Sequence, residues 1–299
     1  MYNIKNEISQ IKPFKKHQRI FILDNADQIS SKQRIWNNLV KMYNRDGAST
    51  LMPMTYSFNK PTDVVALIEE FDKNKIYILK KNIQRQKGLK ITNKLDDILK
   101  ATKQGYVIAQ ELLQDPYIID TRKTNMRFYV LVICNKKEID TYVHNDGFMY
   151  YTKVPFKKNS LTDECNITTG YIDRAVYEKN PLTHNDFRKY LDKNRDLNKY
   201  ENEIVNKGLV LSDVIFNRIN NSIKKIMLAI QPAICNERKL SDSIAFQLFG
   251  VDIALSDSLI PKIMEANKGP DLGTKDGRDS HVKHKVVEDM FKTVKLIDD

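Results

Sequence analysis

The chain has 299 residues, of which 41% are hydrophobic and 29% charged, a composition typical of a folded globular protein rather than a disordered or membrane-embedded one. Its 49 lysines and arginines outnumber 38 acidic residues and give a formal net charge of +11. This positive field favours nucleic acid, acidic peptides or nucleotide phosphates as partners, and charge by itself does not choose among them.

The first 113 residues predict alternating helices and strands. Ile35, Trp36 and Leu39 recur at helical spacing behind a serine, which indicates an amphipathic helix. In chain order, the pattern predicts a strand at 18–24, a helix at 31–43, a helix after Pro61, a strand at 76–80, a basic loop at 81–90, a helix at 93–103 and a strand at 106–113.

The remainder of the chain predicts antiparallel strands with helices packed on them. Its elements, in order, are strands at 126–134 and 139–145 joined as a hairpin, a polar helix at 183–205, an apolar helix at 213–230 ended by Pro232, strands at 244–255 and 259–267 around a tight turn, and a helix at 282–297. Helices on antiparallel sheets favour an α+β or α/β fold.

The cysteines and the hydropathy pattern bear on the compartment. Cys134, Cys165 and Cys235 are odd in number and widely separated, which is typical of a reducing compartment and argues against a zinc site. Cys134 ends an apolar strand, where we expect it to be buried and inert. No run of about 18 uncharged apolar residues occurs, so we expect a cytoplasmic protein without a membrane segment.

Three oxygen-bearing side chains lie on the last two predicted strands. Glu265 and Asn267 alternate onto one face, and a hairpin brings Asp252 beside them. Carboxylate and carboxamide oxygens are ligands that Mg²⁺ accepts, and the ion keeps positions open for phosphates. The pattern therefore predicts a magnesium site, although buried or surface polar residues would give the same pattern.

Two further segments present cations. Lys80 ends an apolar strand ahead of the basic loop, and such a lysine can bind phosphate; the alternative is a solvated basic turn. Lys123, Asn125 and Arg127 recur at period two, so one face of their strand is polar. This pattern favours a functional surface, or else a sheet edge protected by charge.

Several segments, taken in order, resemble the tubulin tyrosine ligase family of ATP-grasp enzymes, which includes tyrosine ligases, polyglutamylases and glycylases. They are SSKQRIWNNLVKMY, MPMTYSF, YILKK, QELL, DTRKTNMRFYVLV, HNDGFMYYT, AFQLFGVDIAL and IPKIMEANKGPDL, between about Ser30 and Val294. The resemblance implies an ATP-grasp fold of three lobes, at 1–74, 75–118 and 119–299, with nucleotide held between two lobes that contain antiparallel sheets.

The resemblance also implies an activity. Mg-ATP phosphorylates a carboxylate, and an amine then displaces phosphate to form an amide. Residues at family-like positions would act as follows: Lys80 on the ATP phosphates, Gln110, Glu111, Leu112 and Leu113 as the adenine hinge, Lys123 and Thr168 beside the nucleotide, Arg127 on an acidic substrate group or the transferring phosphate, and Asp252, Glu265 and Asn267 on Mg²⁺. Arg127, Lys123 and Glu265 are the expected catalytic residues.

Some positions depart from the family pattern. Asn125 stands where an aspartate is usual, and Tyr150 replaces an arginine, for which Lys153 could substitute. Thr169 replaces an asparagine, and Lys90 replaces a glycine of the mobile loop.

These departures leave two classes of function open. The favoured one is a ligase that adds tyrosine, glutamate or glycine to an acidic acceptor such as a tubulin tail, or to a different protein or small molecule. The alternative is a non-catalytic basic module that binds nucleotide, microtubules or nucleic acid on a decayed ligase fold. The complete set of Asp252, Glu265 and Asn267 argues for the enzyme.

Overall fold

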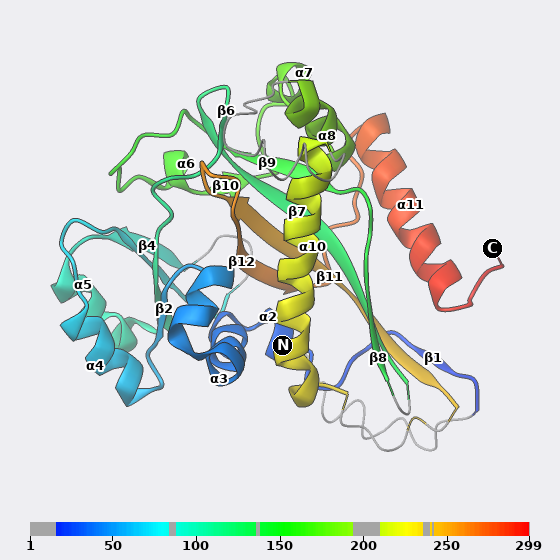
Figure 1. Ribbon diagram of the computed structural model, residues 1–299, viewed down its shortest axis with the longest axis horizontal. Coiled ribbons are helices and arrows are strands. Elements are labelled where there is room, and N and C mark those ends of the chain that lie inside the picture. The colour runs from blue at the N-terminus through cyan, green and yellow to red at the C-terminus, as the bar shows by residue number, and fades with distance from the viewer. Residues whose placement is uncertain are drawn as a thin grey trace.

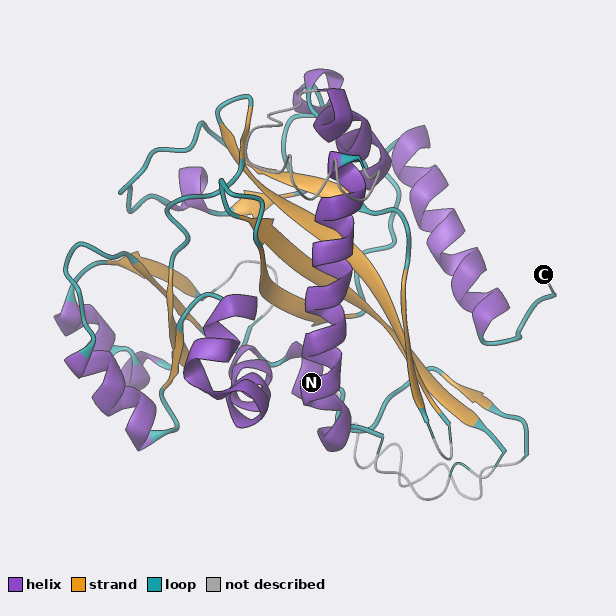
Figure 2. Cartoon of the chain, in the orientation of Figure 1, coloured by secondary structure: helices purple, strands orange, loops and turns teal. Residues whose placement is uncertain are grey.

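A large β-sheet lies at the centre of the protein, a smaller sheet lies to one side of it, and helices pack on both (Figures 1 and 2). The computed structural model describes residues 16–83, 88–135, 138–193, 210–235, 240 and 242–298. One sheet has eight strands and the other has four. This arrangement confirms the predicted α+β fold, with one antiparallel sheet and one sheet that is antiparallel except where β1 (Arg19–Ile20) runs parallel to β11 (Ile244–Leu255).

The four-stranded sheet has the order β2-β5-β3-β4 and is antiparallel throughout. Its strands are β2 (Thr55–Ser57), β3 (Tyr77–Lys80), β4 (Leu89–Thr92) and β5 (Ile108–Glu111). Helices α4 (Pro61–Glu69) and α5 (Leu95–Lys100) contribute Leu67 and Ile98 to a small core with Tyr56 and Tyr77. The sheet therefore has its own hydrophobic cluster.

The eight-stranded sheet has β11 and β7 at its centre. Its strands are β1 (Arg19–Ile20), β6 (Ile118–Ile119), β7 (Arg122–Cys134), β8 (Ile139–Val143), β9 (Phe148–Thr152), β10 (Thr168–Thr169), β11 (Ile244–Leu255) and β12 (Pro261–Lys268). β7 pairs with β11 over ten residue pairs, from Asn125↔Ala254 to Cys134↔Ala245. Apolar residues make up most of both strands, as expected for strands that are buried on both faces of a sheet.

Helices surround this sheet. The longer ones are α3 (Lys32–Leu51), α8 (His184–Lys193), α10 (Leu211–Ile230) and α11 (Gly277–Thr293), and the short ones are α2 (Asp27–Ser30), α6 (Asp163–Asn166) and α7 (Val176–Lys179). Single 3₁₀ turns occupy Thr102–Gln104 and Gln231–Ala233.

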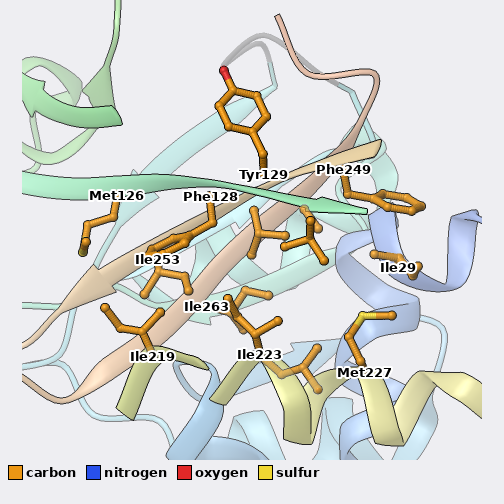
Figure 3. Close-up of a cluster of buried hydrophobic side chains, with 14 of the residues drawn as sticks. Ile29, Met126, Phe128, Tyr129, Ile219, Ile223, Met227, Phe249, Ile253 and Ile263 are labelled. Atoms are coloured by element: carbon orange, nitrogen blue, oxygen red, sulfur yellow. The ribbon is translucent and has the colours of Figure 1, made fainter. Parts of the chain in front are cut away.

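The hydrophobic core lies between α10 and the large sheet, as predicted for the apolar helix. Ile219, Ile223 and Met227 of α10 point toward the strands, where Phe128 and Ile263 are buried among them (Figure 3). Each of these five side chains is at most 8% exposed. α10 ends at Ile230, just before the proline, because proline cannot continue a helix.

Some expected boundaries differ from the structure. The strand expected at 18–24 is only Arg19–Ile20, and the last helix begins at Gly277 rather than at 282, because Asp276 caps it by accepting a hydrogen bond from the Asp279 amide. The polar helix is described to Lys193, and residues 194–205 lie outside the described part, as do 84–87 of the basic loop. The three lobe boundaries stay a prediction.

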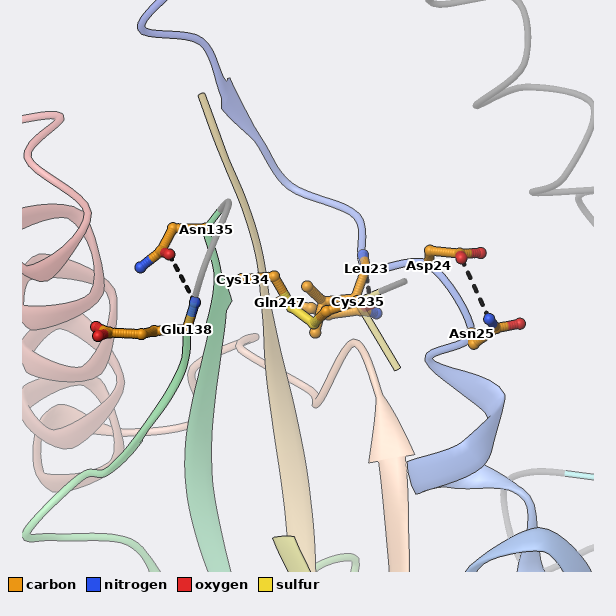
Figure 4. Close-up of a disulfide and its surroundings, with 8 residues drawn as sticks. All are labelled: Leu23, Asp24, Asn25, Cys134, Asn135, Glu138, Cys235 and Gln247. Carbon is orange, nitrogen blue, oxygen red and sulfur yellow. Dashed lines mark hydrogen bonds between the residues drawn. A yellow bond between two sulfur atoms is a disulfide. The ribbon is translucent and has the colours of Figure 1, made fainter. Parts of the chain in front are cut away.

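Two of the three widely separated cysteines lie together. Cys134, at the end of β7, is joined to Cys235, which follows α10, in a disulfide with a Cα–Cα distance of 5.8 Å (Figure 4). Cys165 is a buried free thiol. The spacing, which was interpreted as typical of a reducing compartment, gave no sign of this pair: the two residues are 101 positions apart, and only the tertiary fold brings them together.

Candidate functional site

A cavity of about 660 Å³ is lined by residues from both sheets. Lys80 of β3 faces it from the small sheet, and Lys123, Asn125 and Arg127 of β7 face it from the large one. The polar, period-two face predicted on β7 is therefore the face that lines the cavity. A volume of this size is typical of sites for small molecules and cofactors.

Lys80 is a buried cation at the end of β3. Its Nζ donates to Oε1 of Gln110 at 2.7 Å and lies 3.5 Å from the carbonyl oxygen of Met264. Gln110 is held in turn by Thr55, whose Oγ1 accepts from Nε2 at 2.8 Å. Burial lowers the pKa of Lys80 to about 8, although the charge of Glu265 opposes this. A desolvated ammonium group that is mostly charged at pH 7 favours an anionic ligand.

Lys123 provides a second buried cation in the same cavity. Its Nζ donates to the carbonyl oxygen of Leu113 at 3.3 Å, and burial together with the nearby Lys80 charge lowers its pKa to about 8. The two buried ammonium charges repel one another, so an anion placed between them would relieve this repulsion.

Asp252 lies on the central strand between two functional side chains. In the ladder it is paired with Arg127 of β7 and with Glu265 of β12. Arg127 binds it in a bidentate manner, with Nε 2.5 Å from Oδ1 and Nη2 3.0 Å from Oδ2. Burial raises the pKa of Asp252, and the charge of Arg127 offsets part of that rise.

Glu265 keeps its negative charge because two lysines face it. Lys32 Nζ lies 3.6 Å from Oε2, and Asn267 Nδ2 donates to Oε1 at 3.1 Å. Burial alone would raise the pKa of Glu265, but the charges of Lys32 and Lys80 lower it below its ordinary value. An ionised carboxylate thus lies next to Asp252 at the cavity wall.

These side chains fit a divalent cation by their chemistry. Asp252 and Glu265 supply carboxylate oxygens from paired positions on adjacent strands, and Asn267, paired with Gly250, supplies a carboxamide oxygen. The Asn267 amide nitrogen is directed at Glu265, so its oxygen remains available as a ligand. Hard oxygen donors of this kind suit Mg²⁺.

The other predicted residues are placed as follows. Leu112 and Thr168 line the cavity, as do Tyr150 and Thr169. The side chain of Glu111 forms an ion pair with Lys75 at 2.7 Å, and Glu111 is not among the residues that line the cavity. Lys90 pairs with Asp97 at 2.8 Å, and Lys153 is exposed on the segment after β9.

Sequence reasoning missed Lys32, the first residue of α3. It is 7% exposed, lines the cavity and follows Ser31, which caps the helix by accepting from the Arg34 amide. Its Nζ also donates to the carbonyl oxygen of Ile83 at 3.3 Å. A lysine placed on the buried side of an amphipathic helix was the signal that could have found it.

A cluster of cationic and aromatic side chains at the cavity wall, from the segments around 170 and 275, was also not predicted from the sequence. Tyr171, Arg174, Lys275 and Lys283 line the cavity there. Lys275 Nζ lies 4.2 Å from the centre of the Tyr171 ring, and Lys283 pairs with Asp279 at 3.0 Å. Nothing in the local sequence pattern separates these residues from solvated loop lysines.

The cavity thus brings two buried lysines of different sheets together with the carboxylates of Asp252 and Glu265. The model of the tubulin-tyrosine ligase family matches residues 9–299. The chain therefore belongs to the tubulin-tyrosine ligase family, a family of amide-bond-forming ligases, which confirms the resemblance.

Curated relatives match most of this chain. It is 24% identical to tubulin monoglutamylase TTLL4 of Mus musculus over 93% of this chain and 23% of that protein. It is 24% identical to tubulin polyglutamylase TTLL7 of Xenopus tropicalis over 96% of this chain and 33% of that protein. It is also 24% identical to a probable beta-tubulin polyglutamylase of Tetrahymena thermophila, over 95% of this chain and 24% of that protein. The chain thus spans 23% to 33% of the length of these relatives.

Proposed function

We propose that this protein is an ATP-dependent ligase that joins the amine of a free amino acid to a carboxylate of an acidic protein acceptor. The observation that carries the proposal is the cavity in which Lys80 and Lys123 face Asp252 and Glu265. The relatives are named as tubulin glutamylases, so we propose glutamate as the amino acid and a tubulin tail as the acceptor. A tubulin acceptor would place the reaction in the cytoplasm.

The proposed reaction has two steps. An oxygen of the acceptor carboxylate attacks the γ-phosphorus of ATP, which gives an acylphosphate and ADP. The amine of the incoming amino acid then attacks the acyl carbon, the C–O bond to phosphate breaks, and the amine loses a proton as the amide forms.

The residues of this chain act mainly by binding and by charge. Lys80 and Lys123 neutralise phosphate oxygens, and Arg127 holds the acceptor carboxylate or the transferring phosphoryl group. Asp252, Glu265 and Asn267 would hold Mg²⁺, which supplies further neutralisation of the phosphates. Two anionic reactants can approach each other only when such cations offset their repulsion.

The net charge of +11 is consistent with an acidic acceptor. A positive surface accelerates encounter with an acidic peptide, and the effect weakens with salt. The same positive charge would also attract nucleic acid. Nucleic acid that binds without ATP, in a protein that modifies no acceptor, would indicate the non-catalytic alternative.

The test is an acceptor assay. The full chain is incubated with Mg-ATP, mixed amino acids and acidic peptides that include tubulin tails, and phosphate release is measured together with acceptor mass. We expect mass gains of whole glutamate residues. Glu265→Gln should lower the rate at least about 100-fold because it removes a charge from the site that stabilises the transferring phosphate.

A matched variant controls for the substitution itself. Glu288→Gln makes the same change on the exposed face of α11, where Glu288 pairs with Lys285 and Lys292, and it should leave the rate unchanged. If the protein consumes no ATP and adds no mass to any acceptor of the panel, the ligase is refuted and the binding module is favoured.

A further inference from the structure

Arg127, on β7, is held by contacts with two other strands. Its guanidinium binds both oxygens of Asp252 on β11, and its Cζ lies 5.2 Å from the centre of the Tyr150 ring on β9. Arg127 is paired with Phe148 in the ladder, so Tyr150, two residues further along, projects from the same face of the sheet. The guanidinium thus has an anion and an aromatic ring as neighbours.

Two glycines make room for this arrangement. A Cβ at Gly250 would come within 3.0 Å of Arg127 Nη1, and a Cβ at Gly170 would come within 2.9 Å of Tyr150 Cε1. A larger residue at either position would displace the arginine or the ring. The position of the guanidinium is therefore built into the backbone on both sides.

The contact with Arg127 occupies the carboxylate that the proposed cation needs. Both oxygens of Asp252 are engaged, and the side chains of Arg127 and Asp252 are only 11% and 12% exposed, so little water competes for either partner. A bidentate guanidinium–carboxylate pair in such surroundings is strong and geometrically specific. An ion that binds these oxygens adds positive charge beside the guanidinium, so it competes with Arg127 for Asp252.

We propose that Tyr150 is a positioning residue that holds Arg127 on Asp252, and that a divalent cation displaces Arg127 from Asp252 and turns it toward the anionic substrate. This inference rests on the proposed function, because it takes Asp252, Glu265 and Asn267 as the cation site. What it adds is that Tyr150, which is not one of the cation ligands, controls the position of Arg127.

The energetic role of Tyr150 follows from its ring. A cation over an aromatic face is attracted by the ring quadrupole, more strongly where both groups are desolvated. The ring therefore stabilises the state in which Arg127 is bound to Asp252 and competes with the metal ion. Tyr150→Leu removes the ring's attraction while keeping an apolar side chain, and Tyr150→Phe keeps the ring without the hydroxyl.

The experiment measures metal binding without nucleotide. Mn²⁺ is titrated into the full-length protein and the remaining aqueous ion is quantified by electron paramagnetic resonance. We expect Tyr150→Leu to bind Mn²⁺ about 5-fold more tightly than the wild-type protein, which is the loss of one cation–π contact. Tyr150→Phe should stay within about 2-fold of wild type, and Glu265→Gln should bind at least about 10-fold more weakly.

A second measurement follows Arg127 directly in the wild-type protein, so that the proposal does not depend on how Tyr150→Leu folds. The Nε–H resonance of Arg127 is assigned by its loss in Arg127→Lys and followed as diamagnetic Mg²⁺ is added. We expect it to shift and to exchange faster with solvent as the ion binds.

The outcomes separate the two proposals. Equal Mn²⁺ affinity in wild type and Tyr150→Leu, or an Arg127 resonance that stays fixed while the ion binds, overturns the positioning role and leaves the cation site intact. Mn²⁺ binding that is the same in Glu265→Gln as in wild type, or absent from every variant, refutes the cation site of the proposed function, and the role of Tyr150 falls with it.

Discussion

Replacing Lys80 by methionine removes a buried charge from the cavity while keeping a long unbranched side chain. Burial lowers the pKa of Lys80 from 10.5 to about 8. Each pKa unit corresponds to about 1.4 kcal/mol, so carrying the charge destabilises the folded state by about 3 kcal/mol at pH 7. Loss of the hydrogen bond to Gln110 destabilises the folded state by about 1 kcal/mol. We expect Lys80→Met to raise the free energy of unfolding by about 2 kcal/mol.

The sign of this effect fixes its pH dependence. The folded-state pKa lies below the unfolded value, so the unfolded chain binds more protons between about pH 8 and 10.5. The stability of the wild-type protein therefore gains a contribution from Lys80 as pH rises through this window. The advantage of Lys80→Met is present in full below pH 8 and disappears above pH 10.5.

The same substitution has the opposite effect on nucleotide binding. A hydrogen bond from a charged donor contributes about 1.5–3 kcal/mol, so ATP affinity should fall about 10- to 100-fold. Urea unfolding followed by circular dichroism at pH 7 measures the first quantity, and equilibrium binding of a fluorescent ATP analogue measures the second. Lys103→Met, at an exposed position, is the matched control and should change neither. A Lys80→Met protein that is less stable and binds ATP normally would refute the reasoning.

Two further substitutions test the packing behind the site. Gly147→Ala should destabilise the fold by more than about 2 kcal/mol, because its Cβ would overlap the carbonyl oxygen of Arg127 and the ring of His184; a thermal melting temperature equal to wild type would contradict this. His184 is fully buried, and burial, with the Arg188 charge adding to it, lowers its pKa to about 3. The unfolded chain therefore takes up an extra proton below about pH 6.5. Between pH 7 and pH 5 the free energy of unfolding should fall by about 2 kcal/mol more in the wild-type protein than in His184→Phe. Identical melting curves at pH 5, relative to pH 7, would count against this burial effect.

Local patterns in the sequence determined the elements that carry the site. The apolar spacing of 213–230 predicted a core helix, which is α10, and the alternation of Lys123, Asn125 and Arg127 predicted the strand face that lines the cavity. The hairpin of β11 and β12 was equally readable, because a short turn fixes which residues of two strands can meet. Near the turn, Leu255 is paired with Pro261 and Ile253 with Ile263, a register that would place Met264 opposite Asp252; an irregularity between Asp252 and Ile253 places Glu265 there instead, so the turn by itself did not determine this pair.

The tertiary structure decided which of these residues touch. Arg127 and Asp252 are 125 positions apart, and their contact depends on β7 choosing β11 as its neighbour in one register among many. The same is true of Lys32 with Glu265 and of Cys134 with Cys235. Alternation and helical periodicity report the face on which a side chain lies, since they arise from geometry within one element. They carry no information on which distant element will cover that face, so the chemistry of the cavity became visible only when the two sheets were placed together.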